Sequence, residues 1–337
     1  MNKNIFLSLD KNYVSKLFEN KKGGYFPDAG KNAIKEIIIE KKSPEWAEET
    51  CLARYQIIFD NGETKILRGS GGLGTLKRNA WRTSAFLSKR GLALAKPTDF
   101  IEEIGLFLYE EIEGLPLAAL LADNYDHKAI TGHLNDTALW LAKLHSISQD
   151  DNNFPPALCI SNKELKDAFD KIGQSAPALR NLWPSEKQLN LIDEIGSEKN
   201  ILIHNDFFPG NIIISSGMVF AIDFDKSGLG FPLTDVAQFL LWLEMSKKIW
   251  QINIKENKIL SYQKIFLSAY FKAINMDLEQ ERKKLSRFLA KSCLDQAYHF
   301  INIYLKGQGK LSKHNKEWHK KTIRNFLKQA LIYLSFK

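Results

Sequence analysis

Three oxygen-bearing side chains in the middle of the sequence have the types and spacing that a phosphoryl transfer needs. Asp206 and Asn211 lie in the segment HNDFFPGN, and Asp223 follows twelve residues later in AIDFD. Each comes after a short apolar run, so its side chain can reach a cleft where the chain leaves the core. The reaction requires a carboxylate that orients the attacking hydroxyl, and hard oxygen ligands for Mg²⁺. We predict Asp206 as the catalytic base and Asn211 and Asp223 as metal ligands. The alternative is a turn rich in Asp and Asn that has no chemical role.

These segments resemble the signature of the aminoglycoside phosphotransferase and choline kinase family. That signature reads H-x-D-x-x-x-x-N, then I-D-F/W, then a D-P-x-x-D-like element, and the corresponding residues here are His204, Asp206 and Asn211, then Ile222-Asp223-Phe224, then Pro232 to Asp235. Two more segments are similar to the family, the interlobe linker LFLYEEIEGLPL at 106–117 and the helix WLAKLHSI at 140–147. The resemblance implies a bilobal protein-kinase-like fold that uses ATP or another nucleoside triphosphate with Mg²⁺. The acceptor would be a hydroxyl of a small molecule, such as a sugar, an amino alcohol, a hydroxy amino acid or an aminoglycoside-like compound.

The resemblance also implies which residues bind the nucleotide. Glu110 and Ile112 lie in the linker, and Arg68 takes the position of the family's strand lysine. Arginine is permanently charged and forked, so Arg68 can hold phosphates, whereas Lys65 has the opposite strand parity and should face away. The family's helix glutamate, which pairs with that lysine, corresponds to Asn79 here. These replacements motivate the alternative function of a catalytically weak, kinase-like nucleotide-binding protein, a pseudokinase.

Three further residues near these motifs are expected to be structural. His204 ends an apolar strand and should brace the loop that follows it. Asp235 should cap a helix that begins at Val236, the ordinary use of an aspartate before a helix. His145 falls on the apolar face of a predicted helix and should be a core or capping histidine. Asp235 follows only twelve positions after Asp223, too close for the activation segment of a protein kinase proper.

The elements that must position these residues fall into two groups. Period-2 apolar runs predict strands at 34–40, 52–59 and 63–68, with a hairpin at Asn61-Gly62, and a further strand at 106–112. A helix is predicted between them at 76–90. After Gly114 the period becomes 3.6, as in the helix at 133–146, and short strands are expected only near 201–204, 211–215 and 219–222. We therefore predict an α+β protein with an N-terminal antiparallel sheet lobe (1–113), which has one main helix and binds the nucleotide, and a mostly helical C-terminal lobe (114–337), which carries the catalytic loop and the acceptor site.

A glycine-rich segment offers a competing interpretation. Gly69 to Gly74 (GSGGLG) matches G-x-G-x-x-G and stands between a strand and a helix, as in dinucleotide-binding proteins. No alternation of strands and helices follows, so we disfavour that fold. We expect a mobile connection here.

Composition and charge limit the remaining possibilities. The chain has 337 residues, 44% of them hydrophobic and 26% charged, which is typical of a folded protein. Three well-separated cysteines and the absence of a long apolar run favour a cytoplasmic protein without a membrane anchor. From Val236 onward there are 20 Lys and Arg against 7 Asp and Glu, a balance of +13. That excess favours a neutral or anionic acceptor over a polycationic aminoglycoside, and a nucleic acid partner is not expected.

The acceptor pocket itself follows no motif. Aromatic and polar residues after Asp235 could form it, and aromatic rings could surround a choline-like ammonium group. The competing interpretation is ordinary core packing. The candidates are Trp242, Glu244, Trp250, Tyr270, Asp295, Gln296 and Tyr298.

Overall fold

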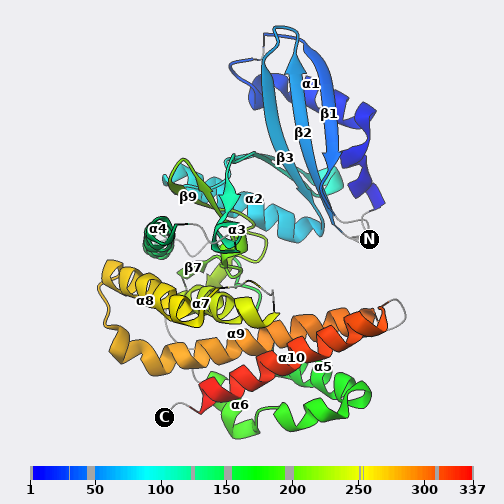
Figure 1. The fold of residues 1–337 in the computed structure, drawn as a ribbon. Helices are drawn as coiled ribbons and strands as arrows, with labels where there is room; N and C mark the ends of the chain where they lie inside the picture. The colour runs from blue at the N-terminus through cyan, green and yellow to red at the C-terminus, as the bar shows by residue number, and fades with distance from the viewer. Residues whose placement is uncertain are drawn as a thin grey trace. The chain divides into compact units, whose positions relative to one another are not determined.

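The structure is a computed structural model that describes residues 3–29, 31–43, 50–122, 126–147, 154–193, 201–249, 252, 254–307 and 311–335 (Figure 1). The chain divides into two compact units. Unit 1 comprises Met1–Leu115 and Ile213–Ser227, and unit 2 comprises Pro116–Ile212 and Gly228–Lys337. The lobe boundary that we expected after residue 113 stays a prediction. The segment 213–227, however, packs with unit 1.

Unit 1 is built on a five-stranded antiparallel sheet in the order β1-β2-β3-β5-β4. The predicted meander and its hairpin are confirmed, because β2 and β3 are joined through Gly62, which has the positive φ of 84° that such turns favour in glycine. The strand expected at 106–112 ends earlier, at Glu110. The strands are β1 (Ile34–Lys41), β2 (Cys51–Phe59), β3 (Thr64–Gly71), β4 (Pro97–Ile101) and β5 (Leu106–Glu110).

An N-terminal helix that the sequence did not lead us to expect packs on one face of this sheet. After the 3-10 helix η1 (Lys3–Leu9), α1 runs over Lys11–Tyr25. Asp10 is its N-cap, with its carboxylate accepting from the N–H of Tyr13 at 2.7 Å. Val14 and Phe18, four residues apart, reach the same core as Tyr55 of β2. The N-terminal segment is therefore part of the sheet's hydrophobic core.

The glycine-rich segment after β3 has a packing explanation. Gly69 and Gly71 belong to β3, where a Cβ would lie 2.7 Å from the ring of Tyr55 and 2.8 Å from Ile5, respectively. The expectation of a mobile connection is wrong for these residues, because they are strand residues that must lack side chains to fit the core. Helix α2 (Gly74–Lys89) then follows close to its predicted span, and the 3-10 helix η2 (Glu102–Ile104) joins β4 to β5.

A short hairpin from the middle of the chain completes unit 1. It consists of β8 (Ile212–Ser215) and β9 (Met218–Ala221), and β8 also pairs with β6 (Leu115–Pro116). A Cβ on Gly114 would collide with the carbonyl oxygen of Ile214, so the linker can approach the hairpin only as glycine. Ala221 forms a parallel bridge to Leu94. The residues after Ala221, Asp223 among them, are therefore positioned by the sheet unit.

Unit 2 is mostly helical, as predicted. One hydrophobic core joins four of its helices through residues such as Phe169, Met245, Ile301 and Phe326. The apolar stripe expected at 133–146 is confirmed in α4, where Leu134, Leu141 and His145 are buried. The helices are α3 (Leu117–Ala122), α4 (His127–Ile147), α5 (Asn162–Ser175), α6 (Glu186–Asp193), α7 (Pro232–Ile249), α8 (Glu256–Ala273), α9 (Leu278–Lys306) and α10 (Lys313–Leu334), with η4 (Pro177–Leu182) and η5 (Pro209–Asn211). Within the described residues, no helix is both long enough and apolar enough to span a bilayer.

Two short strands cross unit 2. β7 (Ile201–Ile203) pairs antiparallel with β10 (Gly228–Gly230), and Leu229 bridges to Pro156. β7 is fully buried. The segment that begins at His204 follows β7 directly.

Candidate active site

A row of polar side chains crosses the sheet of unit 1. Residues directly opposite each other in antiparallel strands share a face, and the register pairs Glu40 with Arg54, Arg54 with Arg68, and Arg68 with Tyr109. Leu67, the neighbour of Arg68, is 2% exposed and lies in the core beneath α1. The row therefore lies on the sheet face opposite α1, as strand alternation predicts for Arg68. Lys65 has the parity of Leu67 and pairs with Glu63.

Glu111, in the linker after β5, joins the two arginines of this row. Its carboxylate accepts from the Arg54 Nε at 3.0 Å and also pairs with the Arg68 guanidinium. Arg54 additionally contacts Glu40 at 3.2 Å. The Glu111 side chain is 13% exposed, so its charge is largely shielded from water and requires these partners. The acidic partner of Arg68 thus comes from the linker, not from α2.

Glu110 and Ile112, the two linker residues predicted to contact the nucleotide, differ in the atoms that they can present to it. The N–H of Glu110 donates to the carbonyl of Lys96 at 2.9 Å, and its carboxylate pairs with the Lys96 ammonium. An adenine contact from the backbone of Glu110 would therefore use its carbonyl oxygen. Ile112 is half-buried in the same linker.

Asp223 lies close to this polar row. Its side chain is exposed and its φ is 66°, in the left-handed region that Asp tolerates better than most residues. Burial raises the pKa of Tyr109 to about 12, and the negative charge of Asp223 adds to the rise while Arg68 opposes it. Asp223 and Arg68 therefore share one electrostatic environment around Tyr109. Backbone strain of this kind is found preferentially at functional sites.

The residues after Asp223 are bound to α2. Lys77 forms an ion pair with Asp225, and the Asn79 amide donates to the carbonyl oxygen of Ser227 at 2.7 Å. Burial raises the pKa of the Asp225 carboxyl, against the opposing charge of Lys77, and the charge of Asp223 raises it further. Asn79 was expected only as a missing glutamate, and the structure gives it a different bond within unit 1.

In unit 2, Asp235 organises the loop that begins at His204. One carboxylate oxygen accepts from the N–H of His204 at 2.8 Å, and the other accepts from the N–H of Asn205 at 2.7 Å. The expectation that Asp235 caps a helix beginning at Val236 is wrong, because α7 begins at Pro232 and Asp235 lies inside its first turn. At 0% exposure, Asp235 holds the loop by charge-assisted hydrogen bonds in the interior.

His145 supports Asp235 from α4. Its Nε2 lies 3.1 Å from the Asp235 carboxylate, and its Nδ1 lies 2.8 Å from the Tyr270 hydroxyl. With the proton on Nε2, the ring donates to Asp235 and accepts from Tyr270. His145 is buried, as predicted, and it also links Tyr270 of α8 through Asp235 to the loop that begins at His204. His204 is also fully buried, and its ring lies edge-on to Phe207.

The remainder of this loop is tethered around Asp206. The side chain of Asn211 donates from Nδ2 to the carbonyl of Asp206 at 2.9 Å, which leaves its amide oxygen as the atom suited to a metal. Gln238 of α7 accepts from the N–H of Phe207 at 3.0 Å and donates to the carbonyl of Asn205 at 3.2 Å. Sequence reasoning missed Gln238. Its position three residues after Asp235 on one helix was the available signal.

The structure gives several proposed acceptor residues other roles. Tyr270 and Trp242 are buried, and Tyr270 is bonded to His145. Asp295 pairs with Lys291 within α9, and Glu244 accepts from the Tyr333 hydroxyl. For Tyr270 and Trp242 the competing interpretation of core packing holds. Trp250 lies outside the described residues.

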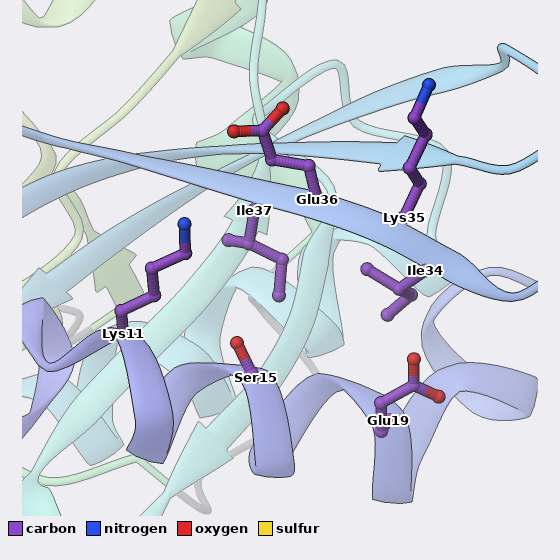
Figure 2. A pocket seen from close by; sticks show the side chains of 7 residues that line it. All are labelled: Lys11, Ser15, Glu19, Ile34, Lys35, Glu36 and Ile37. Carbon is purple, nitrogen blue, oxygen red and sulfur yellow. The ribbon is translucent and has the colours of Figure 1, made fainter.

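A cavity of about 300 Å³ lies between α1 and β1, and none of the predicted site residues lines it. Figure 2 shows Ile34 and Ile37 pointing from the strand toward the helix, while Lys35 and Glu36 point away from it. Its charged residues are two lysines and two glutamates, so no ligand charge is favoured.

The predicted site residues thus form two groups, each within one unit. Arg68 and Asp223 lie in the same environment in unit 1, and Glu110 and Ile112 are in the linker of that unit. Asp206, Asn211, His204 and Asp235 form one tethered loop assembly in unit 2.

Comparisons with known proteins identify the family and the fold. The model of the phosphotransferase enzyme family matches residues 76–256. Choline kinase from Cryptosporidium parvum Iowa II has 15% identity and a TM-score of 0.61, with 94% of each chain covered. Amicoumacin kinase bound to AMP-PNP, Ca²⁺ and its ligand has 15% identity and a TM-score of 0.61, with 97% of this chain and 96% of that chain covered. Plasmodium vivax ethanolamine kinase has 14% identity and a TM-score of 0.59, with 93% and 88% covered.

A search of curated proteins finds no significant match. The structural neighbours nevertheless confirm the predicted kinase-like fold, with its sheet unit and largely helical remainder. The family model covers more than half of the chain, including both the Asp206 loop and Asp223. The protein belongs to the phosphotransferase enzyme family.

Proposed function

We propose that the protein transfers the γ-phosphoryl group of ATP, or of another nucleoside triphosphate, to a hydroxyl of a small molecule. The observation that carries this proposal is the loop at 204–211, whose backbone is fixed by Asp235, Gln238 and Asn211 on both sides of Asp206. These four hydrogen bonds hold the main chain at and beside Asp206, and a fixed main chain gives its half-buried carboxylate the constant position that a catalytic base requires.

In this mechanism Asp206 orients the acceptor hydroxyl and takes its proton. The acceptor oxygen then forms a bond to the γ-phosphorus, the bond from that phosphorus to the bridging oxygen breaks, and the nucleoside diphosphate leaves. His204 and Asp235 do not take part in the chemistry. They keep the loop, and hence Asp206, in place.

The two residues proposed as metal ligands each carry an oxygen atom of the kind that Mg²⁺ prefers. Asp223 offers an exposed carboxylate and Asn211 an amide oxygen. Within the described residues no group of three or more His, Cys, Asp or Glu side chains forms a metal site. Mg²⁺ is commonly bound by one or two protein oxygens together with phosphates and water. When bound, Mg²⁺ would offset the negative charge of the phosphates.

Nucleotide binding is proposed for Arg68 and for the linker residues Glu110 and Ile112. Arg68 is 33% exposed while its partner Glu111 is more buried, so the guanidinium can keep this ion pair and still present N–H groups to a phosphate. The structure of amicoumacin kinase with AMP-PNP supports a nucleotide in a protein of this fold. The ion pair with Glu111 also weakens the pseudokinase alternative, because the arginine has an acidic partner despite Asn79.

For the acceptor, we propose a neutral or anionic hydroxylated metabolite over a polycationic aminoglycoside. The +13 balance of residues 236–337 supports this preference, since this segment supplies α8, α9, α10 and most of α7 in unit 2. Amino alcohols are also proposed as possible acceptors, because the chain is similar in fold to choline and ethanolamine kinases.

Two experiments test the proposal in sequence. Thermal shift with millimolar ATP is measured in Mg²⁺ and in EDTA, and we expect stabilisation that depends on the metal and is lost in Asp223→Ala. ATP consumption is then screened over sugars, nucleosides, homoserine, choline, ethanolamine and aminoglycosides. Absence of any metal-dependent stabilisation contradicts the kinase function. Stabilisation without turnover across the panel favours the pseudokinase.

A further inference from the structure

A buried lysine connects α2 to the segment that carries Asp223. Lys77 stands in the first turn of α2, its side chain is 8% exposed, and its ammonium pairs with Asp225. Lysine is almost never this buried unless it is paired. The ion pair joins residues 148 positions apart in the sequence, both within unit 1. Its partner stands two residues after the proposed metal ligand.

Two more side chains of α2 reach the same turn. Asn79 donates to the carbonyl oxygen of Ser227 at 2.7 Å, and the Ser227 hydroxyl lies 3.0 Å from that of Thr83. The Ser227 N–H and hydroxyl also bond back to the carbonyl of Phe224, at 3.1 and 2.7 Å. The turn 224–227 is therefore closed on itself and fixed to one helix. We call this set of contacts the α2 latch.

The latch bears directly on Asp223. That residue is exposed and has a left-handed φ of 66°, a conformation that costs free energy and persists only when its surroundings impose it. The latch begins at the next residue, Phe224, and continues through Asp225 and Ser227. It fixes the backbone on the carboxyl side of Asp223, while the bridge from Ala221 to Leu94 fixes the other side.

Charge distribution within the segment supports the same conclusion. Asp223 and Asp225 stand close enough for their negative charges to act on each other. Lys77 neutralises the more buried of the two, so the exposed carboxylate of Asp223 remains the one suited to a metal. In the family that this sequence resembles, a glutamate of this helix pairs with the strand lysine. Here a lysine of the helix pairs with Asp225 beside the proposed metal ligand instead.

We propose that Lys77, acting through Asp225, is a positioning residue that holds Asp223 in its metal-binding orientation, so that α2 serves the metal ligand and not Arg68. This inference rests on the proposed function, because it takes Asp223 as the metal ligand. The ammonium of Lys77 touches neither the nucleotide nor the acceptor in this proposal.

The test compares Lys77→Met with the wild-type protein and with a matched control. Methionine keeps the length and apolar contacts of the lysine stem but removes the charge. The control is Arg78→Met, which removes the neighbouring cation of α2, whose pair with Glu102 is exposed. The readouts are the ATP dissociation constant in Mg²⁺ and in EDTA, and hydrogen exchange of the peptide spanning 219–230.

We expect Lys77→Met to weaken Mg²⁺-dependent ATP binding about 10-fold or more, the effect typical of losing a residue that orients a metal ligand. Binding in EDTA should stay within about 2-fold of wild type, since Arg68 and the linker are untouched. Exchange at 223–227 should accelerate, and Arg78→Met should match wild type in all three measurements.

A double variant separates positioning from simple charge neutralisation, and it also covers the case in which Lys77→Met fails to fold. Lys77→Met with Asp225→Asn leaves no unpaired buried charge, so the fold should recover. The contact between residues 77 and 225 stays absent, however, so Mg²⁺-dependent binding should stay weak. Wild-type binding in the double variant would overturn the positioning role, as would wild-type binding in Lys77→Met. If the wild-type protein itself shows no Mg²⁺-dependent binding, the proposed function fails and this inference with it.

Discussion

Removing the Asp235 carboxylate should be among the most damaging single changes in unit 2. Asp235→Ala deletes an acceptor of three hydrogen bonds, from the N–H groups of His204 and Asn205 and from the ring of His145. Asp235 itself is 0% exposed, so water cannot readily replace it at these donors. Breaking a buried charged network by removing one partner costs about 3–5 kcal/mol.

That loss converts into a measurable change in thermal stability. Each kcal/mol shifts the midpoint by about 2–4 °C in a domain of this size, so Asp235→Ala should lower Tm by roughly 6–20 °C. Asp235→Asn keeps one acceptor oxygen but places an NH₂ group against a donor, so its loss should be smaller. Thermal unfolding followed by circular dichroism, in the absence of nucleotide, gives the measurement.

Asp295→Ala is the matched control. Asp295 is also an aspartate within a helix and also has a cationic partner, Lys291, but its side chain is 31% exposed and the pair lies within α9. Partly exposed pairs of this kind contribute about 1 kcal/mol or less. If Asp235→Ala and Asp295→Ala lower Tm equally, the argument that burial makes the Asp235 network costly is refuted.

Three further predictions concern catalysis, nucleotide binding and pH. Asp206→Asn should lower kcat by roughly 10²-fold or more with little change in nucleotide affinity, measured by coupled ADP release, and a wild-type rate would remove Asp206 as the base. Arg68→Ala should raise the KM for ATP more than Lys65→Ala, and the reverse order would show that the phosphate contact is misassigned. Burial lowers the pKa of His319, so the unfolded chain takes up a proton more readily and stability should decline as the pH falls below about 6.5. Urea titrations from pH 7.5 to 5.5 should show a smaller decline in the free energy of unfolding for His319→Leu than for wild type or for the exposed control His314→Gln. If the free energy of unfolding falls equally with pH in all three proteins, His319 is not the cause.

The fold was readable from the sequence wherever a local period or turn signal decides the structure. Alternation predicted β1 to β3, Asn61-Gly62 predicted their hairpin, and the apolar stripe at 133–146 predicted α4. Helix α1 was missed because its apolar face is narrow, with Val14 and Phe18 as its buried residues. The capping aspartate Asp10 followed by Val14 and Phe18 was the signal that would have found it.

The candidate site was readable to a different extent. Motif spacing predicted roles for Asp206, Asn211 and Asp223, and these roles stay predictions. Strand parity predicted the sheet face of Arg68, which the register confirms. The partners of these residues were not predictable, because they come from distant parts of the chain. Asp225 pairs with Lys77 of α2, and Arg68 pairs with Glu111 in the linker that follows the neighbouring strand β5. No local pattern encodes such pairs, since they depend on register and on which helix packs against which turn.

The exchange of partners around Arg68 also limits how this sequence can change. Restoring the family's strand lysine and helix glutamate would require Arg68→Lys together with Asn79→Glu. The new carboxylate would then face the carbonyl oxygen of Ser227, to which Asn79 now donates, and Glu111 would keep Arg54 but lose the forked guanidinium of its other partner. Each reversal alone therefore breaks an existing bond before a new one can form. A single substitution toward the lysine–glutamate pair is therefore unfavourable, and only the two together could be neutral. We expect relatives that carry the arginine to retain both Glu111 and Asn79.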